Sequence, residues 1–210
     1  MILCDLDDFC DDERSMADLA RLEEIKRRIP TFKATLFTIP GRCSPEFIAN
    51  MQRDYPWLDL VQHGWNHDSN YECLKWTVED CREFLFCARL LGLKTRGFKA
   101  PGWQISYGCY EALLAEGYWV ADQPYNDERR PKELRAYKLF PSGQFITAEA
   151  QSIEGKWTNM RCTGVNRQIH GHIGHLNGRN ANALEFLMDE IIEAGKRDPD
   201  FRFIDEVMRP

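Results

Sequence analysis

Short apolar segments alternate with amphipathic segments of helical period at least five times along the chain, and this alternation constrains the fold more than any other feature. It is typical of a parallel sheet or barrel whose strands are connected by helices, so the sequence predicts an α/β fold. Strands are expected at residues 1–6, 33–39, 57–62, 95–100, 118–121, 144–147, 151–153, 165–169 and 201–204. Helices are expected at residues 16–28, directly after Ser44, and at 77–91, 106–116 and 182–194.

Several helix starts are marked by residues that cap helices. Ser15 with Asp18 resembles a capping box at the start of the first helix, and Thr77 with Asp80 marks another. Ser44 precedes a proline, which favours the first position of a helix.

The composition fits one domain that spans residues 1–210, a length that can bury a core without disulfides. The 27 Lys and Arg residues against 33 Asp and Glu residues give a net charge of −6, with no basic run between aromatic residues. Nucleic acids and polyanionic ligands are therefore disfavoured. No apolar run approaches the roughly 20 residues that cross a bilayer, so no membrane partner is expected.

The eight cysteines are dispersed and form no Cys-x-x-Cys pair. The chain starts directly in an apolar strand, with no signal peptide in front of it. We interpret the cysteines as reduced thiols of a cytoplasmic protein.

All five histidines fall in two short clusters. His63 and His67 lie four residues apart, and His170, His172 and His175 form the second group. Two histidines at this spacing can turn the same way, and one carboxylate completes a three-ligand metal site with open positions. This pattern is typical of a catalytic metal, and His175 is interpreted as part of a surface loop.

Chemically active residues follow the predicted strands. Asp7 and Asp8, His63, Pro101 and His170 each come after one, at the carboxyl-end rim where α/β folds place their sites. Of the two adjacent carboxylates, one can bind a metal while the other takes a proton from water. The alternative for this pair is a solvated turn.

The segment around Pro101 carries two cations. Arg96 and Lys99 lie within reach of the same rim, where a cation would hold Asp7 in its charged form. Trp103 either lines a pocket or fills the core.

His170 and His172 are candidates for a proton donor, because an imidazole at a strand end can protonate a leaving group. Asp122 closes another predicted strand. It either orients His170 by accepting the second ring proton or is a structural carboxylate.

Together, Asp7-Asp8, His63-x-x-x-His67, Phe98-Lys-Ala-Pro-Gly102 and Ile169-His-Gly-His172 resemble the polysaccharide deacetylase superfamily, the NodB-homology or carbohydrate esterase 4 (CE4) group. The resemblance covers residue 1 to about residue 190. It implies a distorted seven-stranded (β/α) barrel in which Asp8, His63 and His67 bind a divalent metal, Asp7 is the general base and His170 the general acid.

The chain departs from the family pattern at several positions. Gly64 and Asp68 stand where the family usually has Ser or Thr and Pro, and Lys99 stands where it usually has Arg. The tip of the third motif is Pro-Gly-Trp, and the fourth motif has no clear counterpart. These departures leave the metal ligands in place but alter the residues around the substrate.

The implied activity is hydrolysis of an amide or ester, with deacetylation of an N-acetylated sugar or related small molecule as the leading hypothesis. Zn²⁺ is the expected metal, with Co²⁺, Ni²⁺, Mn²⁺ and Fe²⁺ as alternatives. The sequence leaves the oligomeric state open. His172, Lys99, Arg96, Pro101, Trp103 and Asp122 are the candidates for binding or orienting the substrate.

Three alternatives remain open. A haloacid-dehalogenase-like phosphatase would use Asp5 as nucleophile and Asp7 as acid/base, but Phe9 departs from its motif and the histidines would have no role. A non-haem Fe(II) oxygenase lacks its usual His-x-Asp spacing here. An inactive metal- or sugar-binding module on the deacetylase fold is the non-enzyme alternative.

Overall fold

The computed structural model describes residues 1–123, 126, 128–138, 144–149, 158–161, 167–173 and 183–208. The chain forms two compact units, and each is described by itself. The first comprises Met1–Leu36, Trp57–Asp59 and Phe140–Ile204. The second comprises Phe37–Pro56, Leu60–Leu139 and Asp205–Pro210.

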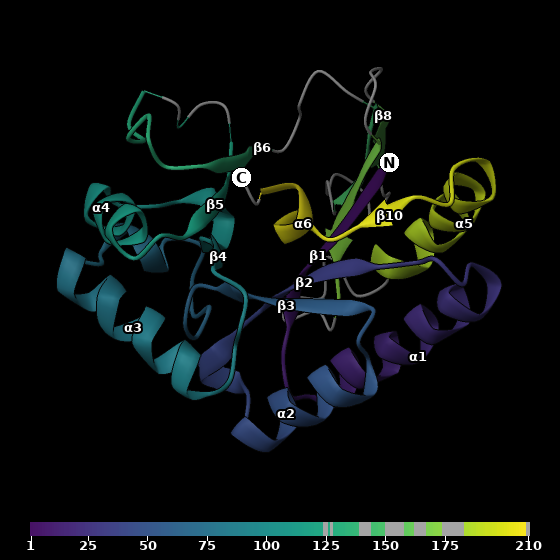
Figure 1. Ribbon diagram of the computed structural model, residues 1–210, viewed down its shortest axis with the longest axis horizontal. Coiled ribbons are helices and arrows are strands. Elements are labelled where there is room, and N and C mark those ends of the chain that lie inside the picture. Colours follow the sequence, from purple (N-terminus) through teal and green to yellow (C-terminus); the bar gives the residue numbers. More distant parts are fainter. Residues whose placement is uncertain are drawn as a thin grey trace. The chain divides into compact units, whose positions relative to one another are not determined.

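The first unit is built around β1 (Ile2–Phe9), which is buried along its whole length. This strand pairs in parallel with β9 (Arg167–His172) and with the short β10 (Phe201–Arg202), which runs beside it in Figure 1. The strand order in this unit is β2-β1-β9-β7-β8, where β2 is Ala34–Thr38 (of which Phe37 and Thr38 belong to the second unit), β7 is Gln144–Glu149 and β8 is Thr158–Arg161. The β7–β8 pair is antiparallel, whereas β7 and β9 are parallel.

One face of β1 and β9 is covered by a helix. The helices α1 (Glu13–Arg28) and α5 (Ala183–Arg197) pack together, and α5 lies against β7 and β9. A Cβ atom on Gly171 would overlap the Leu187 side chain of α5 and lie 3.6 Å from Leu6 Cδ2. Leu6 and Gly171 therefore face α5, so the residues that alternate with them face away from it.

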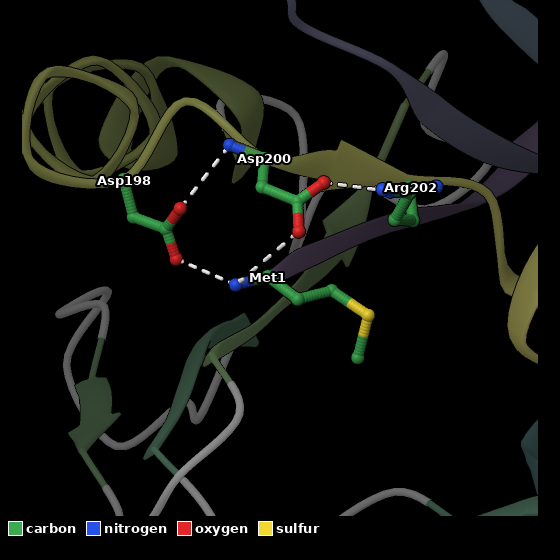
Figure 2. A network of polar contacts seen from close by, with 4 residues as sticks. All are labelled: Met1, Asp198, Asp200 and Arg202. Atoms are coloured by element: carbon green, nitrogen blue, oxygen red, sulfur yellow. Dashed lines mark hydrogen bonds and ion pairs between the residues drawn. The ribbon is translucent and has the colours of Figure 1, made fainter.

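Ionic contacts join the ends of β1 and β10 (Figure 2). The Met1 ammonium lies 2.6 Å from Asp198 Oδ2 and 3.8 Å from Asp200 Oδ2, and Arg202 Nε donates to Asp200 Oδ1 at 2.6 Å. Their side chains are 29–50% exposed, so each ion pair contributes about 0–1 kcal/mol. The backbone bond from Ile2 N to Asp200 O, at 2.7 Å, fixes the same junction.

The second unit contains four neighbouring parallel strands in the order β3-β4-β5-β6. They are β3 (Leu58–His63, of which Leu58 and Asp59 belong to the first unit), β4 (Gly97–Lys99), β5 (Trp119–Asp122) and β6 (Ala136–Lys138). Its helices are α2 (Pro45–Asp54), α3 (Val78–Leu90), α4 (Tyr107–Ala115) and α6 (Ile204–Met208, from Asp205 onward), with short 3-10 turns η1 (Pro40–Arg42), η2 (Glu72–Leu74) and η3 (Pro101–Trp103).

An apolar cluster between α3, α4 and the strands forms the core of the second unit. The two helices lie side by side in Figure 1, and α4 also contacts β5. Phe98, Val120 and Tyr110 are central members of the cluster, each with no more than 1% of its surface exposed. This core holds the strand ends that carry the second unit's polar residues.

Two of the expected helix caps are confirmed and one is wrong. Ser44 caps α2, and Thr77 forms a complete capping box with Asp80 at α3. Ser106, the first residue of the helix expected at 106–116, caps α4. The cap of α1 is Asp12, whose side chain accepts from Ser15 N at 2.7 Å. Asp12 rather than Ser15 occupies the cap position because α1 starts one turn earlier than the apolar periodicity indicates.

The expected ends of the central strands are also too early. β1 continues to Phe9 and β9 to His172, so Asp7 and His170 lie within strands rather than after them. Continued parallel pairing up to Asp7 opposite His172 holds this polar stretch extended. His63 and Asp122 are likewise the last residues of their strands.

The α/β class is confirmed, while β6, β8 and α6 were not expected because they are short and weakly patterned. The strand expected at 151–153, together with Cys162 and His175, lies outside the described residues. The seven described cysteines are free thiols. None of the helices in the described part of the chain has the length and apolar character needed to span a bilayer.

Gly97 provides a test of packing in the second unit. A Cβ atom there would overlap the indole ring of Trp119, its partner on β5. Gly97→Ala should therefore lower the free energy of unfolding by about 1–3 kcal/mol through overpacking, measured by urea denaturation. Trp119→Phe makes room for the added methyl group, so the double variant should lose less stability than the sum of the two single variants. Strictly additive losses would show that the two sites do not share this space.

Candidate active site

In the first unit, the face of β1 and β9 opposite α5 is lined by carboxylates and imidazoles. The register pairs Asp5 with His170 and Asp7 with His172. Side chains of paired residues in parallel strands point to the same face, and this is the face that Leu6 and Gly171 avoid. Asp5, Asp7 and His170 are exposed by 0%, 5% and 1%, so these polar groups lie inside the protein.

A short hydrogen bond joins the imidazole of His170 to a carboxylate. His170 Nδ1 lies 2.5 Å from Asp5 Oδ1, and the other ring nitrogen, Nε2, lies 3.9 Å from Asp7 Oδ2. An ionised carboxylate can only accept, so we assign the proton of this bond to Nδ1. The geometry places a candidate acid, His170, beside a candidate base, Asp7, in one buried cluster.

The partner of His170 differs from the one suggested by the sequence. Asp122 was the candidate for orienting this ring, but Asp5 holds its Nδ1 atom. The sequence gives Asp5 a role only in the phosphatase alternative, as the nucleophile. The sequence signal for Asp5 is the strand period of two, which puts its side chain on the same face as that of Asp7.

Asp8 adopts an unusual backbone conformation. Its φ angle is +72° although it lies within β1 and is 95% buried. Left-handed backbone is costly for a residue with a Cβ and concentrates at functional sites. Asp8 is thus held in a strained conformation directly after the candidate base.

In the second unit, His63 and His67 come together. Their ring centroids lie 5.0 Å apart with the planes inclined at 62°. His63 Nδ1 donates to the backbone oxygen of Lys99 at 3.1 Å, which leaves the lone pair on Nε2. A second ring nitrogen bonded to a carbonyl is the usual arrangement of a metal-binding histidine, so His63 fits the role of a metal ligand.

The ligand set Asp8, His63 and His67 remains a prediction, because Asp8 belongs to the first unit and the two imidazoles to the second.

Lys99 and Arg96 lie at opposite ends of β4. Lys99 is 99% buried, and its Nζ atom lies 3.6 Å from the centroid of the Trp103 ring and 5.0 Å from that of Phe37. These cation–π contacts stabilise a buried ammonium group. Arg96 precedes the strand, is exposed, and donates to Glu116 O at 3.2 Å, so it does not join the Lys99 end.

Asp122 is the centre of a polar network within the second unit. Its Oδ2 atom accepts from the Tyr110 hydroxyl at 2.7 Å and from Arg130 Nη1 at 3.0 Å, and its Oδ1 atom accepts from Asn126 Nδ2 at 2.6 Å. Burial and the neighbouring carboxylate raise the pKa of Tyr110 well above its usual value. Asn126 also donates to Trp103 O at 3.1 Å, so the network fixes the loop that carries Trp103.

The sequence matches no protein-family model and no curated protein sequence. Solved structures, however, are similar along nearly the whole chain. The structure of a peptidoglycan N-acetylglucosamine deacetylase aligns with a TM-score of 0.56 at 16% identity, covering 98% of this chain and 86% of that one. The chain has the fold of the CE4 deacetylases.

Two further solved structures extend this likeness to the CE4 fold. Peptidoglycan deacetylase PdaC from Bacillus subtilis aligns with a TM-score of 0.55 at 13% identity, covering 99% of this chain and 89% of that one. A CE4 family pseudoenzyme from Bacillus anthracis aligns with a TM-score of 0.53 at 13% identity, covering 100% and 65%. The fold is therefore shared by enzymes and by a protein described as inactive.

The position of Asp5 disfavours a phosphatase. A phosphatase nucleophile must reach its substrate, whereas Asp5 is fully buried and hydrogen-bonded to His170.

The two candidate partners of His170 can be distinguished by NMR of the histidine rings. Asp5→Asn should change the ¹⁵N shifts of the His170 ring, because the charged acceptor of its Nδ1 proton is lost. Asp122→Asn is the matched control and should leave these shifts unchanged. The reverse result would reassign the orienting carboxylate.

Proposed function

We propose that the protein is a metal-dependent hydrolase that removes the acetyl group from an N-acetylated sugar or a related small molecule. The observation that carries the proposal is the buried Asp5–His170 hydrogen bond, with Asp7 3.9 Å from the other ring nitrogen. A paired acid and base are needed for amide hydrolysis but not for ligand binding alone. The CE4 fold supports this class of reaction, since similar solved structures are named as peptidoglycan deacetylases.

We assign metal binding to Asp8, His63 and His67. Support comes from the paired imidazoles of the second unit and from the His63–Lys99 backbone bond that orients one of them. When bound, a divalent ion such as Zn²⁺ would polarise the substrate carbonyl and lower the pKa of its bound water toward about 7. Co²⁺, Ni²⁺, Mn²⁺ and Fe²⁺ are alternatives for the same donors.

The proton transfers are assigned to Asp7 and His170. Asp7 accepts the proton of the attacking water, and His170 donates a proton from Nε2 to the departing amine, since an amide nitrogen leaves badly without one. Asp5, bound at Nδ1, stabilises the imidazolium form and fixes the ring. A buried carboxylate thus serves the acid rather than acting as a nucleophile.

Substrate contacts are assigned to Trp103 and His172, both partly exposed. Lys99 stacks on the Trp103 ring, and Asn126, held by Asp122, donates to the backbone oxygen of Trp103. His172 follows His170 on the same face, with ring centroids 5.8 Å apart. A carbohydrate or small-molecule partner and a cytoplasmic location are part of this proposal.

A second candidate is a metal- or sugar-binding module without activity. The likeness to a CE4 pseudoenzyme favours it. Turnover distinguishes it from the hydrolase, since the module would bind its ligand but hydrolyse neither amides nor esters.

Substitutions at the two adjacent aspartates can distinguish the metal ligand from the general base. Asp7→Asn should keep one metal ion per chain while losing about 10²- to 10⁴-fold in turnover, because the amide cannot accept the water's proton. Asp8→Asn, its matched neighbour, should lose the metal. Metal content by atomic emission and the hydrolysis rate decide between them, and loss of metal in the first variant alone would exchange the two roles.

The acid role is tested by the leaving group. His170→Ala should slow hydrolysis of an N-acetyl amide more than that of an activated acetyl ester, because an activated alcohol leaves without a proton and an amine does not. His172→Ala should have a smaller effect on both substrates. Equal losses on amide and ester in the His170 variant would remove its assignment as the general acid.

A further inference from the structure

The loop that joins His63 to His67 is closed around a carboxylate from outside the loop. Three consecutive backbone N–H groups donate to Glu72: those of Trp65 and Asn66 to Oε1 at 3.2 and 3.0 Å, and that of His67 to Oε2 at 2.8 Å. Successive N–H groups that point into one concavity form an anion-binding nest. Here the anion is the protein's own side chain.

The loop backbone is left-handed at both ends of this nest. Gly64 has a φ angle of +56° and His67 one of +55°. A Cβ atom on Gly64 would lie 2.8 Å from Glu72 Oε2, so only glycine leaves room for the carboxylate. His67 has a Cβ atom, so its left-handed conformation must be held by its surroundings.

Opposite contacts fix the carbonyl side of the same loop. Gly41 N donates to Trp65 O at 2.8 Å, and Arg42 Nε donates to Asn66 O at 2.7 Å. The carbonyl groups are thus held by η1 and the N–H groups by Glu72. Glu72 is itself anchored, because the next residue, Cys73, is fully buried in the core cluster.

We propose that Glu72 is a positioning residue that preorganises His67 for metal binding, an inference that rests on the metal site of the proposed function. Charge-assisted bonds to three amides hold the backbone in the conformation that brings the His67 ring within 5.0 Å of the His63 ring. Without the carboxylate, three N–H groups point into the same concavity and repel one another, so the loop relaxes. Metal binding then has to restore the strained conformation, which weakens affinity.

The test is the affinity of the chelator-treated full chain for Zn²⁺ and Co²⁺, measured by calorimetry and by the Co²⁺ absorption spectrum. Glu72→Gln keeps the side-chain volume but leaves one accepting oxygen and sets an NH₂ group against the amides. We expect roughly 10- to 100-fold weaker binding, the usual effect of removing a group that orients a metal ligand. The amide resonances of residues 65–67 in the metal-free variant should shift, while the rest of the spectrum shows a folded chain.

Two control variants separate positioning from charge. Asp68→Asn removes the same charge beside His67 from a side chain that is 76% exposed and lies 3.4 Å from Arg42 Nη2, so affinity should change less than about twofold. Glu72→Asp keeps the charge but shortens the reach to the amides, and it should also weaken binding.

Wild-type affinity in Glu72→Gln, or in Glu72→Asp, would overturn the positioning role while leaving the proposed function intact. Wild-type protein that binds neither metal would instead overturn the proposed function and, with it, this inference. A Glu72→Gln variant that fails to fold leaves Glu72→Asp to decide by the same affinity measurement.

Discussion

The chemistry of the first unit depends on the register of β1 against β9. In this register Asp5 lies beside His170 and Asp7 beside His172, while Leu6 and Gly171 turn toward α5. A shift of one residue would turn the carboxylates toward the apolar surface of α5 and leave them without an imidazole. A buried carboxylate without a partner costs several kcal/mol, so the acidic strand is stable in only one register.

The pair that results is not explained by stability alone. Asp5 and His170 are both at least 99% buried, and replacing a buried ion pair by apolar residues of similar size is often neutral or stabilising. A short bond that fixes the proton on one ring nitrogen does have a chemical use, because it determines what the other nitrogen can do. We therefore interpret the pair as part of the proton-transfer machinery.

Carboxylates also organise the loops of the second unit, although in a different way. Asp122 ties Tyr110, Asn126 and Arg130 together behind Trp103, and Glu72 closes the loop that carries His67. Hydrogen bonds to an ionised carboxylate are about twice as strong as those between neutral groups, so they hold such loops effectively. The CE4 fold is shared with a pseudoenzyme, so the fold by itself does not determine activity.

The amino-acid sequence by itself determined the α/β class and most of the element positions. Hydrophobic periodicity and the caps at Ser44, Thr77 and Ser106 are local signals, and the structure follows them. The spacing of the histidines and the Asp7–Asp8 pair likewise indicated the candidate residues for the proposed chemistry. Helix and strand periods depend on neighbours along the chain, so they can be read without knowing the tertiary contacts.

Tertiary structure alone decided how far β1 and β9 extend and which carboxylate meets which imidazole. Asp5 was overlooked as the partner of His170 because they are 165 residues apart and meet only through strand pairing. Glu72 was overlooked because its role lies in the backbone amides of residues 65–67, which carry no signal in the side-chain pattern. Local patterns fix where strands and helices form, whereas hydrogen bonds between distant segments fix the proton positions and loop conformations on which the proposed chemistry depends.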